Sequence, residues 1–268
     1  MKWRILIVIA AIGLLSCKKN KNGIPDEPWF NLFTVEDDLK LGEQVMREIE
    51  SNPQEYPILD SAQYPQAYAH LYRMRDTILS TGKLKYANKF PWRIRIIRDD
   101  STLNAFCAPA GYIYIYTGII KYLRNEAELM GVLAHEMAHA DRRHVTQQLT
   151  QAYGVQTLLS LITGRENPGL LAEIASALLM LSFSRDHERD ADAHSVIYLC
   201  PTSYKADGAA YFFEYILQAG GPRIPAFLST HPDPGERVQN IRQRARDMGC
   251  SGGEFYDARY AQLKASLP

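Results

Sequence analysis

Two histidines and a glutamate near the middle of the chain are spaced so that they can act together at one metal ion. His135, Glu136 and His139 form the pattern His-Glu-x-x-His. On a helix, residues four apart lie about 40° apart around the axis, so both imidazoles can bind one metal ion. Glu136 is turned about 100° from His135, where it can reach a metal-bound water without binding the metal. The pattern predicts half of a zinc site with Glu136 as general base; a core helix with two ordinary histidines is the alternative.

The residues before this motif have the features of a helix start. Asn125 has a side chain suited to cap a helix, and Glu128 supports the cap at the third helical position. Leu129, Val132 and Leu133 then recur at helical spacing. A helix over the motif is therefore predicted.

We expect this helix to continue through residue 144. His144 would then be turned about 140° from His139, so it would point away from the metal and is excluded as a ligand. A third histidine of the metzincin kind is also missing, because residue 145 is Val. The third ligand must come from elsewhere.

An acidic stretch, residues 184–192, can supply that ligand, and we expect it to continue the apolar run 169–183 as one helix. Glu188 and Asp192 are four apart and share a face, whereas His187, Asp190 and His194 point elsewhere. A carboxylate that joins two histidines leaves one zinc position open for water. We predict Glu188 as this ligand and Asp192 as acceptor of a ring proton from a metal-bound histidine. A solvated charged face is the alternative.

Two short segments with alternating side chains, residues 92–97 and 112–117, predict strands. The second comes just before the metal-motif helix, so a small sheet should lie beside that helix. An edge strand at 112–117 would bind an extended peptide through its backbone. An ordinary strand that packs through its tyrosines is the alternative.

His231 lies in a loop between two predicted helices, with prolines on its C-terminal side. Such a histidine can donate a hydrogen bond to an oxyanion on a substrate. A plain loop histidine is the other interpretation. The following basic helix, residues 234–248, is expected to turn its charges to solvent.

The composition is that of an ordinary globular protein. The chain has 268 residues, of which 46% are hydrophobic and 22% charged, enough for one large catalytic domain. Thirty basic residues balance thirty acidic ones. Without an overall positive field, nucleic acid is not expected as a partner.

The first 17 residues have the pattern of an export signal. Lys2 and Arg4 precede an apolar run over 5–15 that is too short to span a bilayer, and Ser16-Cys17 follows. The site resembles a bacterial lipobox, which implies cleavage before Cys17 and lipid attachment to it; a plain secretory signal is the alternative. Residues 18–33, which begin with the polar stretch 18–28, are expected to form a flexible tether.

The remaining cysteines, Cys107, Cys200 and Cys250, are odd in number, so at least one stays free. Cys200 and Cys250 can pair, but spacing alone does not establish this. Cys107 is most simply a buried small apolar residue.

Four motifs in order resemble the M48 family of zinc metallopeptidases, of the secreted bacterial lipoprotein kind. They are Asn104-Ala-Phe with the Gly111 strand, His135-Glu136-x-x-His139, Ser184-Arg-x-x-Glu188-x-Asp-Ala-Asp192, and Ser229-Thr-His231-Pro232 with Arg237. The resemblance implies an α+β fold: a mainly helical, zincin-like domain over 34–250 with a small sheet next to the motif helix. Residues 251–268 form a C-terminal tail in this scheme.

The resemblance also implies one zinc ion per chain, bound by His135, His139 and Glu188, with Glu136 as base and Asp192 behind a ligand. It places His231 over the cleft. It assigns substrate binding to the residues around the second strand, namely Asn104, Gly111, Tyr112, Ile113 and Tyr114.

On this basis we expect a metalloendopeptidase for unfolded or misassembled envelope proteins. It would be held at a bacterial envelope membrane by lipidated Cys17, on the periplasmic face and at the outer rather than the inner membrane. The rival is a peptide-binding chaperone or assembly factor in which His231 closes the zinc site as a fourth ligand.

Overall fold

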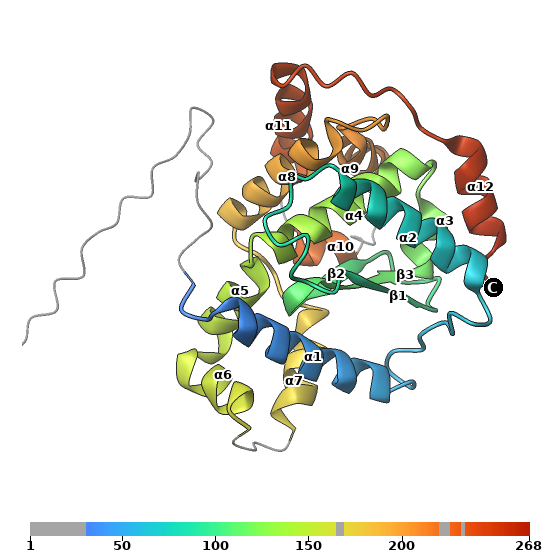
Figure 1. The fold of residues 1–268 in the computed structure, drawn as a ribbon. Helices are drawn as coiled ribbons and strands as arrows, with labels where there is room; N and C mark the ends of the chain where they lie inside the picture. Colours follow the sequence, from blue (N-terminus) through green and yellow to red (C-terminus); the bar gives the residue numbers. More distant parts are fainter. Residues whose placement is uncertain (1–30, 165–168, 220–225, 232–233) are drawn as a thin grey trace, which may run out of the picture.

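A computed structural model describes residues 31–164, 169–219, 226–231 and 234–268. The export signal over 1–17, Cys17 and nearly all of the tether over 18–33 lie outside the described residues. The described part is mainly helical with one small sheet (Figure 1), which confirms the predicted fold class.

Helix α4 (Glu126–Asp141) carries the histidine motif through the middle of the molecule, and every one of its residues is buried. The Asn125 side chain accepts a hydrogen bond from the backbone of Glu128, as predicted. Helices α8 (Arg185–Leu199) and α9 (Gly208–Ala219) pack on one side of α4, and the sheet lies on the other (Figure 1). Gly131 permits the close approach of α9, because a Cβ there would collide with the backbone of Ala209.

The sheet has three strands, β1 (Arg93–Ile97), β2 (Ala105–Ala108) and β3 (Tyr112–Tyr116), in the order β1-β3-β2. Strand β3 is parallel to β1 and antiparallel to β2. The expectation of an edge strand at 112–117 is therefore wrong, because β3 is paired on both sides. Within the described sheet, the strand nearest α4 with an unpaired side is β2.

Helices α1 (Val35–Ser51), α6 (Val155–Ile162) and α7 (Leu170–Leu178) form a layer below the sheet in Figure 1. Thr34 and Asp37 form a reciprocal cap at the start of α1. Helix α2 (Pro65–Ser80) packs near β1, and α3 (Thr117–Tyr122) joins β3 to α4. Together these elements enclose the sheet between two helical layers.

Two predicted continuous helices are interrupted. Helix α4 ends at Asp141, and α5 (His144–Tyr153) begins after Arg143, which has a left-handed backbone with φ 61°. Helix α7 ends at Leu178, and Ser184 caps the separate helix α8. The expectations of one helix through residue 144 and of one helix over 169–192 are both wrong.

The C-terminal part contributes α10 (Ala226–Thr230), α11 (Pro234–Asp247) and α12 (Asp257–Ala265). The predicted tail over 251–268 thus contains a helix that packs on the body through buried Tyr260 and Leu263. A disulfide joins Cys200, at the end of α8, to Cys250, just beyond α11, and Cys107 is buried and free. The disulfide fastens together two helices that carry residues of the candidate site.

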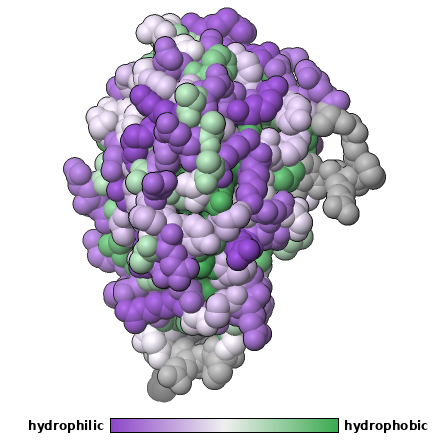
Figure 2. Space-filling model, turned by 90° about the vertical axis from the view of Figure 1, so that its right-hand side faces the viewer, coloured by the Kyte–Doolittle hydropathy of each residue, from purple (hydrophilic) through white to green (hydrophobic). Residues whose placement is uncertain are grey.

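The visible surface in Figure 2 is mostly hydrophilic, with hydrophobic side chains scattered over it. Among the residues placed by the structure, no helix combines the length and the apolar character needed to cross a membrane.

Candidate metal centre

Four buried side chains from three parts of the fold converge at the middle of α4. They are His135 and His139 of α4, Glu188 of α8, and His231, which directly follows α10. One ligand atom from each lies within 4.8 Å of all the others. The structure therefore brings together the three predicted ligands and the predicted loop histidine.

The separations of these atoms fit a single small cation. His135 Nε2 lies 3.0 Å from His139 Nε2 and 3.2 Å from His231 Nδ1. Glu188 Oε1 lies 3.0 Å from His231 Nδ1 and 3.4 Å from His139 Nε2. Ligands about 2.0–2.1 Å from a tetrahedral zinc ion are about 3.3 Å apart, so the donor set matches zinc in both type and spacing.

A buried arginine holds the acidic side of this cluster. Asp192 Oδ1 lies 3.0 Å from His135 Nδ1, on the side of the ring that faces away from the cluster. Arg237 donates to both oxygens of Asp192 at 2.7 Å and contacts Glu188 Oε2, also at 2.7 Å. Only 3% of Arg237 is exposed. One guanidinium thus fixes two carboxylates of α8.

These contacts keep the two carboxylates charged inside the protein. Burial acts to raise the pKa of Glu188 and of Asp192, but Arg237 and the neighbouring histidines together outweigh burial, and both pKa values are lowered. A pair of ionised carboxylates beside histidine nitrogens is a favourable environment for a divalent cation.

Within the described part of the chain, the carboxylate of Glu136 has no arginine partner of the kind that holds Glu188 and Asp192. Its side chain is fully buried, and neither carboxylate oxygen accepts a hydrogen bond from any described residue. His231 Nε2 lies 3.3 Å from Glu136 Oε1. Burial raises the pKa of Glu136, which brings its basicity closer to neutral pH.

Comparison with known proteins shows which family the chain belongs to. The model of peptidase family M48 matches residues 65–245, which include all four converging side chains and Arg237. The chain belongs to peptidase family M48. The family resemblance predicted from the sequence is confirmed.

Individual relatives match parts of the chain. Mitochondrial metalloendopeptidase OMA1 of Arabidopsis thaliana is 30% identical over 152 residues, which cover 57% of this chain and 31% of that protein. The β-barrel assembly-enhancing protease of Escherichia coli is 28% identical over 193 residues, or 65% of this chain and 39% of that protein. Metalloprotease YcaL of the same organism is 27% identical over 150 residues, or 54% and 59%. The chain thus spans less than two thirds of the length of each.

The residues predicted to bind substrate lie in and beside the sheet, where most of them have structural roles. Asn104 is buried, and its side-chain oxygen accepts a hydrogen bond from the backbone N–H of Ala105. Gly111 has φ 78°, and a Cβ there would lie 2.7 Å from the Trp92 ring, so this glycine is needed by the backbone. The backbones of the three strand residues, Tyr112, Ile113 and Tyr114, pair with β1 and β2. Peptide binding by strand addition to β3 is therefore excluded.

Two residues contribute to the site in ways that the sequence does not predict. The sequence predicts Arg237 on a solvent-facing basic helix, but the side chain is buried against α8. A continuous helix predicts His144 on the side away from the metal, but its ring contacts that of His139. The only sequence signal for Arg237 is its place in the fourth motif, and none marks the helix break before His144.

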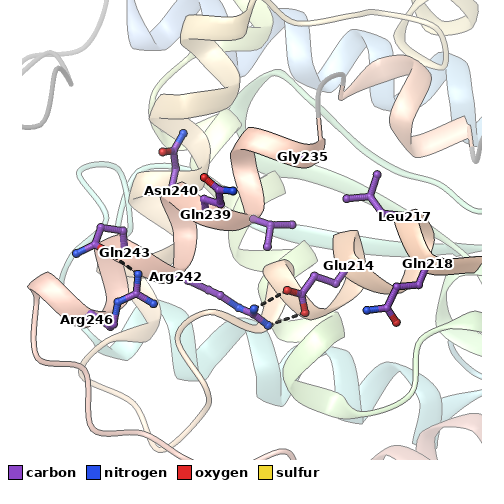
Figure 3. A pocket seen from close by; sticks show the side chains of 10 residues that line it. Glu214, Leu217, Gln218, Gly235, Gln239, Asn240, Arg242, Gln243 and Arg246 are labelled. Atoms are coloured by element: carbon purple, nitrogen blue, oxygen red, sulfur yellow. Dashed lines mark hydrogen bonds and ion pairs between the residues drawn. The ribbon is translucent and has the colours of Figure 1, made fainter.

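A separate pocket of about 780 Å³ opens between α9 and α11 (Figure 3). Its walls are mostly polar and include the ion pair between Arg242 and Glu214. None of the four converging side chains lines it. It is therefore not the candidate metal centre.

The affinity of the cluster for zinc should rise about tenfold per pH unit between pH 6.5 and 8.5. Burial acts to lower the pKa of His135, but Asp192 and Glu188 outweigh it and raise this pKa to about 9. Below that pH the His135 ring of the metal-free protein holds a second proton, which zinc must displace. Chelator competition at several pH values, corrected for protonation of the chelator, measures how the zinc affinity changes with pH. An affinity independent of pH would show that zinc binding does not displace a proton from His135.

Proposed function

We propose that the protein is a zinc-dependent endopeptidase, with one zinc ion held by His135, His139 and Glu188. The observation that carries the proposal is the set of ligand atoms at tetrahedral spacing beside a buried glutamate whose oxygens accept no hydrogen bond from the described residues. When bound, zinc would supply Lewis acidity that activates water and polarises a peptide carbonyl. A structural zinc site would leave the buried carboxylate of Glu136 without a role.

The protein groups have distinct tasks in this mechanism. Glu136 takes the proton from the attacking water and then gives it to the leaving amine. Asp192 holds the ring of His135 through the nitrogen that faces away from the cluster, and Arg237 holds Asp192. Because this scaffold is buried and charge-paired, the site is preorganised before substrate binds.

His231 determines whether the site is open. In this structure its Nδ1 atom lies in the donor set, 3.0 Å from Glu188 Oε1, while Nε2 points at Glu136. The ring thus occupies the space that water and a substrate carbonyl would need. We infer that this is a closed, latent form, which opens when His231 withdraws from the donor set. The rival function, a peptide-binding chaperone or assembly factor, follows if His231 never withdraws.

Replacing His231 by alanine should therefore raise peptide hydrolysis several-fold and weaken zinc binding, because one donor to the cluster is lost. Cleavage of an unfolded protein at saturating zinc measures the first effect. A rate that falls about a hundredfold would instead assign His231 to oxyanion stabilisation.

We propose unfolded or misassembled envelope proteins as substrates. The name of the Escherichia coli relative refers to β-barrel assembly, and the disulfide between Cys200 and Cys250 suits an oxidising compartment such as the periplasm. We further propose a lipid anchor at Cys17 in the bacterial envelope, at the outer membrane. The edge of β2 that pairs with no described strand would bind an extended substrate.

The test is cleavage of casein by the purified protein. Protein stripped with a chelator should be inactive, and one equivalent of zinc should restore cleavage. Zinc binding without cleavage, in both the wild type and His231→Ala, would favour the chaperone. Failure to bind zinc would remove the metallopeptidase proposal.

A further inference from the structure

His144 lies directly behind one of the proposed zinc ligands. The break at Arg143 starts α5 at His144 and returns this ring to α4. His144 Nδ1 lies 3.1 Å from His139 Nδ1, the ring nitrogen opposite the one in the metal cluster. Both side chains are fully buried. The contact is therefore with the outer side of the ligand and not with the metal position.

The other end of the His144 ring is also fixed. His144 Nε2 lies 3.1 Å from Asp190 Oδ2, and Arg142 Nε donates to the same oxygen at 2.7 Å. The ring of His187 stacks on that of His144, with centroids 4.4 Å apart and planes 16° apart. A continuous chain of contacts thus runs from His139 through His144 to a carboxylate neutralised by arginine.

The direction of the hydrogen bonds in this chain follows from its two ends. A histidine that binds a metal through Nε2 carries its proton on Nδ1 and must donate it. Ionised Asp190 can only accept. The two conditions agree in one arrangement, in which His144 accepts at Nδ1 and donates from Nε2.

We propose that His144 is a positioning residue that holds His139 in its metal-binding tautomer and orientation, with Asp190 setting the tautomer of His144. This inference rests on the zinc site proposed above. Asp190 and Asp192 are two apart on α8 and therefore point to different sides of the helix. Asp192 supports His135 directly, whereas Asp190 supports His139 through the inserted imidazole.

A matched pair of variants separates hydrogen bonding from packing. His144→Phe keeps a ring that fills the space and stacks on His187, but it cannot accept a hydrogen bond. His144→Asn loses the ring, but its amide oxygen can accept near the position of Nδ1. We expect the zinc Kd of the full chain to rise about 10- to 100-fold in His144→Phe and by less than about threefold in His144→Asn.

Chelator competition at one pH gives each Kd, and melting of the metal-free proteins shows whether each variant folds. An unchanged Kd in folded His144→Phe, or a larger loss in His144→Asn than in His144→Phe, would overturn the inference, because packing alone predicts that order. If the wild type itself binds no zinc, the proposed metal site fails and the inference with it.

A measurement on the wild type avoids dependence on the folding of variants. In zinc-loaded protein labelled with ¹⁵N-histidine, long-range ¹H–¹⁵N spectra should show His144 protonated at Nε2 and unprotonated at Nδ1. The reverse tautomer would rule out acceptance from His139.

Discussion

Glu136→Gln should lower the rate of peptide hydrolysis by about a thousandfold and leave one zinc ion bound per chain. Glutamine keeps the shape of the side chain but cannot take a proton from water. The glutamate oxygens accept no hydrogen bond from other described residues, and glutamine keeps an oxygen that can face His231 Nε2, which lies 3.3 Å from Glu136 Oε1, so the substitution should not disturb the fold. Removing a buried carboxylate whose pKa is already raised by burial should also leave stability unchanged or slightly higher.

The measurement combines cleavage of an unfolded protein with elemental analysis of the same samples. Glu173→Gln, on the exposed face of α7, makes the same chemical change away from the site and should retain full activity. Equal rates for Glu136→Gln and wild type would remove Glu136 as the base. Loss of zinc together with activity would show that Glu136 acts in metal binding instead.

The parts of the site that could be predicted are those set by local helical geometry. The spacing of four residues put His135 with His139, and Glu188 with Asp192, on shared faces, and the structure places each pair as expected. Two residues four apart share a face wherever the local helix is intact. The pairing of Glu188 with Asp192 is therefore correct although α7 and α8 are separate helices, because Ser184 caps a new helix before Glu188.

The errors arose where distant residues decide the backbone. Arg143 takes a left-handed conformation, which costs an ordinary residue about 1 kcal/mol or more. Its guanidinium bonds to Asp38 of α1 and to the backbone oxygens of Phe33 and Thr34, far away in the chain. No glycine or proline marks this break, so the sequence predicted a continuous helix. The consequence was the misplacement of His144.

The strand order of the sheet and the burial of Arg237 also depend on residues that are distant in the chain. The parallel pairing of β1 with β3 joins segments that are not neighbours in the chain, and alternation of side chains does not reveal strand order. Arg237 is buried because Glu188 and Asp192 offer it two carboxylates in a core position. A helix full of arginines gives no local sign of which one turns inward.

Glu188→Ala should lose its zinc almost completely. The substitution removes a ligand, and it leaves the buried Arg237 guanidinium beside the cluster without one of its two carboxylates. Each ligand of a zinc site accounts for about 3 kcal/mol of binding, so loss of the ligand alone weakens affinity by roughly a hundredfold or more. The uncompensated positive charge should weaken it further, since it repels a cation at short range.

Glu188→Gln is the matched control, because it keeps an oxygen donor and the side-chain volume but removes the negative charge. After dialysis at micromolar protein concentration, we expect about one zinc per chain in wild type, an intermediate content in Glu188→Gln and almost none in Glu188→Ala. Elemental analysis measures the content, and melting of the metal-free proteins checks the fold. If folded Glu188→Ala retained a full equivalent of zinc, Glu188 would not be a ligand, and the cation would have to be held by the three histidines that converge with it.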